Sequence, residues 1–163
     1  MNILYICTHN RCRSILSEAI TNHLAPNYLA QGRVQAFSAG SQPSGHVHPL
    51  SLKYLNEKGI STDGLNSKSW DEFTGQNIDV VITVCDSAAA EPCPHWLKHN
   101  TTQFHWSLPD PSKLTGTENE IRDAFYAVMH TIDQRVKKLL DADLCSMKPA
   151  ERLRVLTKLA GEM

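Results

Sequence analysis

Short apolar runs recur along the chain at intervals that leave room for a helix between them. The clearest run, residues 79–84 (DVVITV), is rich in β-branched residues and does not alternate with polar ones, which is typical of a strand covered on both faces. Residues 3–6 and 34–37 are shorter apolar runs, and residues 101–106 give a fourth, weaker strand pattern. The pattern predicts four strands.

The intervening segments carry apolar residues at helical spacing. Residues 14–24 and 49–58 are predicted helices, and Gly59 is a plausible stop for the second. Thr117 and Glu120 have the spacing of a capping box and precede a long amphipathic stripe over 121–139. A last helix begins at Pro149 and ends near Gly161.

Strands that alternate with helices indicate an α/β fold. We predict a three-layer sandwich in which a four-stranded parallel sheet is flanked by helices, with ligands bound beyond the carboxyl ends of the strands. Residues 1–140 are expected to form the main domain, and 141–163 a helical extension packed on it. We find no repeat and no linker that would divide the chain further.

The composition and net charge of the chain limit the kinds of molecule that it is expected to bind. The 163 residues carry a formal net charge of −1, so nothing favours a nucleic acid or an anionic membrane surface. No stretch approaches the roughly 20 apolar residues of a membrane span, and the apolar start of the chain is too short for a signal peptide. We expect a cytoplasmic protein in which the five cysteines are mostly reduced.

The segment between the first strand and the first helix carries the candidate chemistry. A tight loop that enters a helix N-terminus directs backbone N–H groups and partial positive charge at an anion, and the same field stabilises a thiolate. Cys7 is therefore the predicted nucleophile, and the Arg13 guanidinium is suited to bidentate contact with a tetrahedral oxyanion. The predicted oxyanion loop comprises Thr8, His9, Asn10, Arg11, Cys12, Arg13 and Ser14.

Cys12 has two interpretations. We favour a small buried loop residue, and the alternative is a regulatory thiol that pairs with Cys7. The plain structural reading of the loop, in which Cys7 is a buried strand-end cysteine and Arg13 a solvated helix residue, is disfavoured by the strand–loop–helix context.

The loop resembles the signature of low-molecular-weight tyrosine phosphatases and of the arsenate reductases that share their fold. The segments 15–19 (ILSEA), 38–40 (SAG) and 110–111 (DP) recur in the same order as in that superfamily. The commonest reductase loop has Gly where this chain has His9 and Ser where it has Arg11, so the chain departs there towards more positive charge. The resemblance implies that Asp110 is the general acid.

Two further cysteines, Cys85 and Cys93, stand where the resembling reductases have redox cysteines. The resemblance then implies a relay. Cys7 attacks arsenate, Cys85 attacks the adduct and releases arsenite, and Cys93 resolves the Cys7–Cys85 disulfide into a Cys85–Cys93 disulfide. An external thiol or dithiol reductant, of the thioredoxin or glutaredoxin type, would recycle the enzyme, and no tightly bound cofactor is expected. Phosphate and sulfate would compete with arsenate.

Three alternatives stay open. A phosphatase of the same fold would use only Cys7, Arg13 and Asp110, although Ser112 and Lys113 stand where such phosphatases have aromatic residues. An oxyanion- or metal-binding redox sensor would use the cysteines without catalysis, for example with Cys85, Cys93, His95 and His99 around zinc. Finally, Cys85 and Cys93 could be buried structural thiols.

Overall fold

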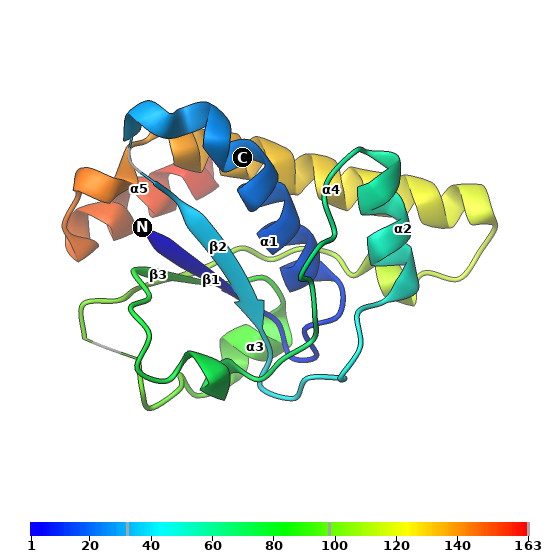
Figure 1. The fold of residues 1–163 in the computed structure, drawn as a ribbon, viewed down its shortest axis with the longest axis horizontal. Coiled ribbons are helices and arrows are strands. Elements are labelled where there is room, and N and C mark those ends of the chain that lie inside the picture. Colours follow the sequence, from blue (N-terminus) through cyan, green and yellow to red (C-terminus); the bar gives the residue numbers. More distant parts are fainter. Residues whose placement is uncertain (32, 98, 163) are drawn as a thin grey trace.

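The computed structural model describes residues 1–31, 33–97 and 99–162 (Figure 1). Its strands are β1 (Asn2–Ile6), β2 (Gln35–Ala39), β3 (Val80–Thr83) and β4 (Thr102–His105). Its α-helices are α1 (Arg13–Leu24), α2 (Pro49–Glu57), α3 (Asp86–Ala90), α4 (Glu118–Asp141) and α5 (Pro149–Gly161). Short 3-10 turns lie at Ala25–Gln31, Trp70–Phe73, Pro111–Lys113 and Leu144–Ser146.

The four strands form one parallel sheet in the order β2-β1-β3-β4. β1 is central, with Ile6 opposite Ala39 of β2 on one side and Thr83 of β3 on the other. The carboxyl ends of three strands therefore meet at one edge, where the loop after β1 and the start of α3 both lie. The predicted α/β sandwich with a four-stranded parallel sheet is confirmed.

Helices cover the sheet because their apolar stripes pack on its two faces. α1 packs against β2 and α4, and α2 adjoins both helices. Figure 1 shows these three helices on one side of the strands and the short α3 on the other. Leu16 of α1 and Phe125 of α4 are fully buried in the resulting core. The predicted capping box at Thr117 is present at the start of α4.

The C-terminal segment lies against β4, the edge strand. Leu156 of α5 is fully buried, Arg152 Nε donates to the carbonyl of Leu144 at 2.9 Å, and Thr102 Oγ1 donates to the carbonyl of Pro149 at 3.3 Å. α5 thus shields an edge that would otherwise expose unpaired backbone groups. None of the helices in the described residues has the length and apolar character required to cross a membrane.

Candidate active site

The loop after β1 holds Cys7 in a chain of hydrogen bonds. Asn10 Nδ2 donates to Ser14 Oγ at 2.8 Å, so the Ser14 hydroxyl proton is free to point at Cys7 Sγ, which lies 2.8 Å from the same oxygen. Asn10 and Ser14 are fully buried and Cys7 is 4% exposed. The Ser14 hydroxyl is therefore placed to donate a hydrogen bond to the sulfur of Cys7.

The loop is shaped by contacts with residues far away in the sequence. Asn10 adopts a left-handed conformation (φ 44°), and its Oδ1 accepts from the backbone N–H of Lys68 at 2.9 Å. The loop carbonyls of Thr8, His9 and Arg11 accept from backbone N–H groups between residues 42 and 48. These bonds hold the loop at the start of α1, the end of a helix at which backbone N–H groups can bind an anion.

Gly40 permits the loop to approach β2 closely. A Cβ atom at this position would lie 2.5 Å from the Thr8 carbonyl oxygen and 2.9 Å from that of Cys7. Both distances are far below van der Waals contact, so the position requires glycine.

Arg13 and Asp110 face each other across the mouth of the loop. Arg13 Nη2 lies 3.2 Å from Asp110 Oδ2, and Nη1 donates to the carbonyl of Leu108 at 3.1 Å. The other Asp110 oxygen accepts from the backbone N–H and the hydroxyl of Ser112. Both charged side chains are mostly buried, so the pair is held in place beside Cys7.

A cavity of about 180 Å³ joins these groups. Cys85 lies in its wall together with Cys7, so two of the three predicted relay cysteines share one cavity. The lining residues are Cys7, Thr8, His9, Arg11, Cys12, Arg13, Cys85, Ser87, Asp110, Ser112 and Lys113. Ser87 was not predicted as a lining residue from the sequence.

Cys85 is a buried residue that caps the N-terminus of α3. Its Sγ accepts from the backbone N–H of Ala88 at 3.4 Å and lies 3.8 Å from Thr8 Oγ1. Cys85 lies two residues after the end of β3, and the backbone N–H of the intervening Val84 donates to the carbonyl of Ile6 at the end of β1. The sheet thereby fixes Cys85 next to the loop of Cys7.

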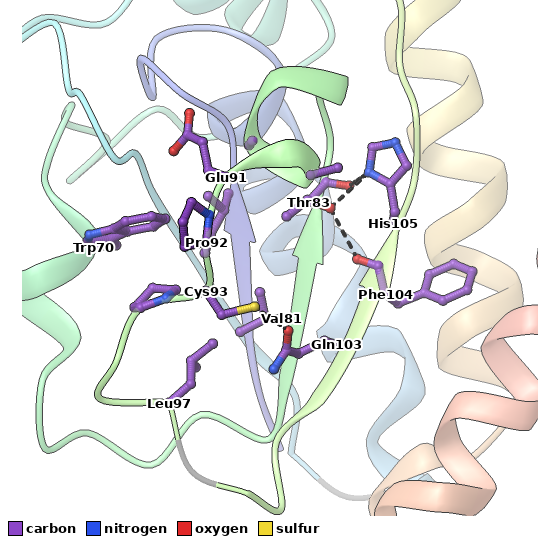
Figure 2. A pocket seen from close by; sticks show the side chains of 14 residues that line it. Trp70, Val81, Thr83, Glu91, Pro92, Cys93, Leu97, Gln103, Phe104 and His105 are labelled. Atoms are coloured by element: carbon purple, nitrogen blue, oxygen red, sulfur yellow. Dashed lines mark hydrogen bonds between the residues drawn. The ribbon is translucent and has the colours of Figure 1, made fainter.

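Cys93 lies beyond the far end of α3, in a second cavity of about 230 Å³ (Figure 2). The cysteine is exposed, and its thiol donates to Gln103 Oε1 of β4 at 2.7 Å. Cys85 does not line this cavity and Cys93 does not line the first one. All five cysteines are free thiols, so this geometry is that of the fully reduced chain.

This separation bears on the zinc alternative. Cys85 and Cys93 open onto different cavities, and within residues 1–31, 33–97 and 99–162 no group of three or more His, Cys, Asp or Glu residues is placed to hold a metal. The described residues therefore do not bring Cys85, Cys93, His95 and His99 together as a four-ligand site.

Cys12 is 3% exposed, and burial raises the pKa of its thiol to about 12. It therefore remains protonated at neutral pH and is not a nucleophile. This agrees with the interpretation of Cys12 as a buried loop residue.

The start of α3 is tied to the end of β4. His105 Nε2 lies 3.0 Å from Asp86 Oδ1, and the Ser107 hydroxyl donates to the same oxygen at 2.9 Å. These two hydrogen bonds lower the pKa of the Asp86 carboxyl. Asp86 thus follows Cys85 as an anchored carboxylate, a contact that sequence analysis did not identify.

Comparison with known proteins gives a consistent picture. The model of the family described as low molecular weight phosphotyrosine protein phosphatase matches residues 2–150. An arsenate reductase of Shouchella clausii is 33% identical over 139 residues, which cover 85% of this chain and 94% of the relative. A glutaredoxin arsenate reductase of Synechocystis sp. is 27% identical over 138 residues, covering 85% and 95%.

Solved structures show the same fold. One described as an arsenate reductase in the phosphate binding state has a TM-score of 0.69 and 25% identity, covering 86% of this chain and 97% of that one. A thioredoxin-dependent arsenate reductase of Corynebacterium glutamicum has a TM-score of 0.66 and 25% identity, covering 90% of this chain and 63% of that one.

Proposed function

The chain belongs to the low molecular weight phosphotyrosine protein phosphatase family, and from this premise we propose that it is an arsenate reductase. The observation that carries the proposal is the position of Cys85 in the wall of the cavity that contains Cys7. A phosphatase of this fold needs a nucleophilic cysteine, an arginine and a general acid. A second buried thiol beside the nucleophile adds what a two-electron reduction requires.

The first step is attack on the oxyanion. Cys7 Sγ forms a bond to arsenic while an oxygen leaves with a proton from Asp110. Arg13 and the loop N–H groups hold the other oxygens of arsenate. For Asp110 to act as an acid, its contact with Arg13 must open, and an incoming oxyanion offers Arg13 a better bidentate partner.

The next two steps are thiol chemistry. Cys85 attacks the sulfur of Cys7, an S–S bond forms, and the S–As bond breaks with its electron pair on arsenic, so arsenic is reduced and arsenite leaves. Cys93 then attacks Cys85, giving a Cys85–Cys93 disulfide and returning the Cys7 thiolate. Cys93 must leave Gln103 for this step, and α3 has only five residues to rearrange.

An external thiol or dithiol reductant then reduces the Cys85–Cys93 disulfide. The relatives are named for two different reductants, glutaredoxin and thioredoxin. The exposed position of Cys93 makes it the sulfur that either reductant reaches first. A reducing cytoplasm is the setting in which this cycle would run.

Phosphate monoester hydrolysis is the second candidate, because Cys7, Arg13 and Asp110 are arranged as such a reaction needs. Ser112 and Lys113 in the cavity wall offer no aromatic surface for a tyrosyl group. We therefore rank arsenate reduction first.

A thiol count tests the proposal. Reduced, desalted protein is incubated with arsenate without added reductant, and free thiols and arsenite are measured. We expect two of the five thiols to disappear and a Cys85–Cys93 disulfide to be found by peptide mapping. Cys85→Ser should give no arsenite, and the control Cys145→Ser should behave as the wild type. Unchanged thiols with rapid aryl-phosphate hydrolysis would favour the phosphatase.

A further inference from the structure

We propose that Glu91 is the proton acceptor for Cys85 and that it acts through the hydroxyl of Thr8. The inference rests on the proposed reduction of arsenate, in which Cys85 must lose its thiol proton as it attacks Cys7. It assigns a chemical role to a residue that lies between the two redox cysteines in the sequence and outside the predicted site.

Thr8 connects Cys85 with Glu91. The Thr8 hydroxyl donates to Glu91 Oε1 at 3.1 Å, and Thr8 Oγ1 lies 3.8 Å from Cys85 Sγ. A carboxylate only accepts, so the single Thr8 proton points at Glu91 and the lone pairs of the same oxygen remain free. The Cys85 thiol can therefore donate to Thr8 while Thr8 donates to Glu91, which orders the three groups as a proton path.

The helix between the two residues produces this arrangement. Cys85 caps the N-terminus of α3 and Glu91 follows its last residue in an extended conformation. Figure 2 shows the Glu91 carboxylate pointing away from the Cys93 sulfur, which faces Gln103. Glu91 is thus directed back towards the catalytic loop, although it lies next but one to Cys93 in the chain.

Glu91 is available as an acceptor. Its carboxylate forms no salt bridge with any cation of the described residues, and Thr8 is the group that hydrogen-bonds it there. The residue is partly exposed and also lines the cavity of Cys93, so a proton taken from Thr8 can pass on to solvent.

Other charged and titratable groups surround Cys85. Asp86 on its own helix is engaged by His105 and Ser107, and Asp110 by Arg13 and Ser112. Within the part of the chain that the structure describes, neither carboxylate has a hydrogen-bonded path to Cys85. The remaining such groups in the wall of the first cavity are Cys7, His9, Arg11, Cys12 and Lys113.

The step balances as follows. As Cys85 Sγ bonds to Cys7 Sγ and the electron pair of the S–As bond stays on arsenic, the Cys85 proton moves to Thr8 Oγ1 and the Thr8 proton moves to Glu91 Oε1. The path ends with a neutral Glu91 carboxyl, an unchanged Thr8 hydroxyl and a Cys7–Cys85 disulfide.

Glu91→Gln separates this role from simple tethering. Glutamine keeps an oxygen that accepts from Thr8 and has the same size, but it cannot take the proton. An ordinary thiol is only a few per cent ionised at neutral pH, so we expect the variant to release arsenite roughly 30-fold more slowly at pH 7. The deficit should shrink as the pH rises towards 9, because hydroxide can then take the proton that Glu91 would accept, whereas Glu91→Asp should keep the wild-type pH profile.

The experiment is a single turnover with saturating arsenate in a Cys93→Ser background, in which the reaction stops at the Cys7–Cys85 disulfide. Arsenite release is followed from pH 6 to pH 9 in that background, with and without Glu91→Gln. Equal rates at every pH, or a deficit that does not change with pH, would overturn the role of Glu91. If the Cys93→Ser protein itself released no arsenite, the proposed reductase function would fail instead.

Discussion

Gly40→Ala tests how strictly the anion loop depends on its contact with β2. The added Cβ would lie 2.5 Å from the Thr8 carbonyl oxygen and 3.1 Å from Asn10 Cβ. To restore ordinary contact, near 3.4 Å, the Thr8 carbonyl must move by about 0.9 Å. The carbonyl is backbone and is itself held by the N–H of Gln42 at 2.9 Å, so it cannot yield as a side chain would.

Two magnitudes follow from this displacement. Inserting a methyl group into a packed site costs about 1–3 kcal/mol of the free energy of unfolding. A shift of nearly 1 Å in groups that position a substrate costs about 100-fold in rate, or about 2.7 kcal/mol of activation free energy. We therefore expect Gly40→Ala to lower kcat/KM for arsenate by about 100-fold while the chain still folds.

The assay combines steady-state arsenite production with urea unfolding. The matched control is Gly161→Ala, because a Cβ at that helix end meets nothing within 4 Å. This variant should keep the wild-type activity and should not lower the free energy of unfolding. Wild-type kcat/KM in Gly40→Ala would refute the view that the loop is fixed by this contact. Loss of activity in both variants would point to a cause other than the contact.

Three further predictions concern single side chains. Cys12→Ala should keep activity within a few-fold, because burial raises the pKa of the Cys12 thiol to about 12. For the same reason, iodoacetamide at pH 8 should label the exposed Cys93 and leave Cys12 unmodified in a peptide map, and rapid labelling of Cys12 would contradict this. Burial raises the pKa of Glu18, so its contribution to stability is greatest below its unfolded pKa, near 4.3, and is lost as the pH rises through the folded value. In urea titrations, the free energy of unfolding of Glu18→Gln minus that of the wild type should therefore increase from pH 4 to pH 7. A decrease in this difference would be inconsistent with a raised pKa of Glu18. Gln103→Leu removes the hydrogen-bond acceptor of Cys93, and a bond worth about 0.5–1.5 kcal/mol implies roughly 2- to 13-fold faster formation of the Cys85–Cys93 disulfide. The rate is measured by quenched alkylation, and an unchanged rate would mean that this bond does not restrain Cys93.

The strands of the sheet, and the residues that follow them at the first cavity, could be predicted because both depend on short, local sequence patterns. Strands with apolar β-branched residues and helices with capping signals can be read directly, and Cys7 and Cys85 follow strands whose carboxyl ends necessarily meet at one edge. Arg13 could be placed for the same reason, since α1 begins where the loop ends.

The contacts that depend on distant segments could not be read in this way. The ion pair between Arg13 and Asp110 joins residues 97 positions apart in the sequence. The hydrogen bond from the Lys68 backbone N–H to Asn10 Oδ1 joins residues 58 positions apart. Helix α3 was also missed, because five residues are too few for a periodic pattern. Helix α3 lies between Cys85 and Cys93, which line different cavities.

The stoichiometry of arsenite in the absence of any reductant tests the central claim most directly. Wild type and Cys93→Ser should each release one arsenite per chain and then stop, since both retain the Cys7 and Cys85 thiols that supply two electrons. Cys85→Ser should release none. Arsenite from Cys85→Ser at the wild-type amplitude would contradict the account, because Cys85 would then not be the second electron donor.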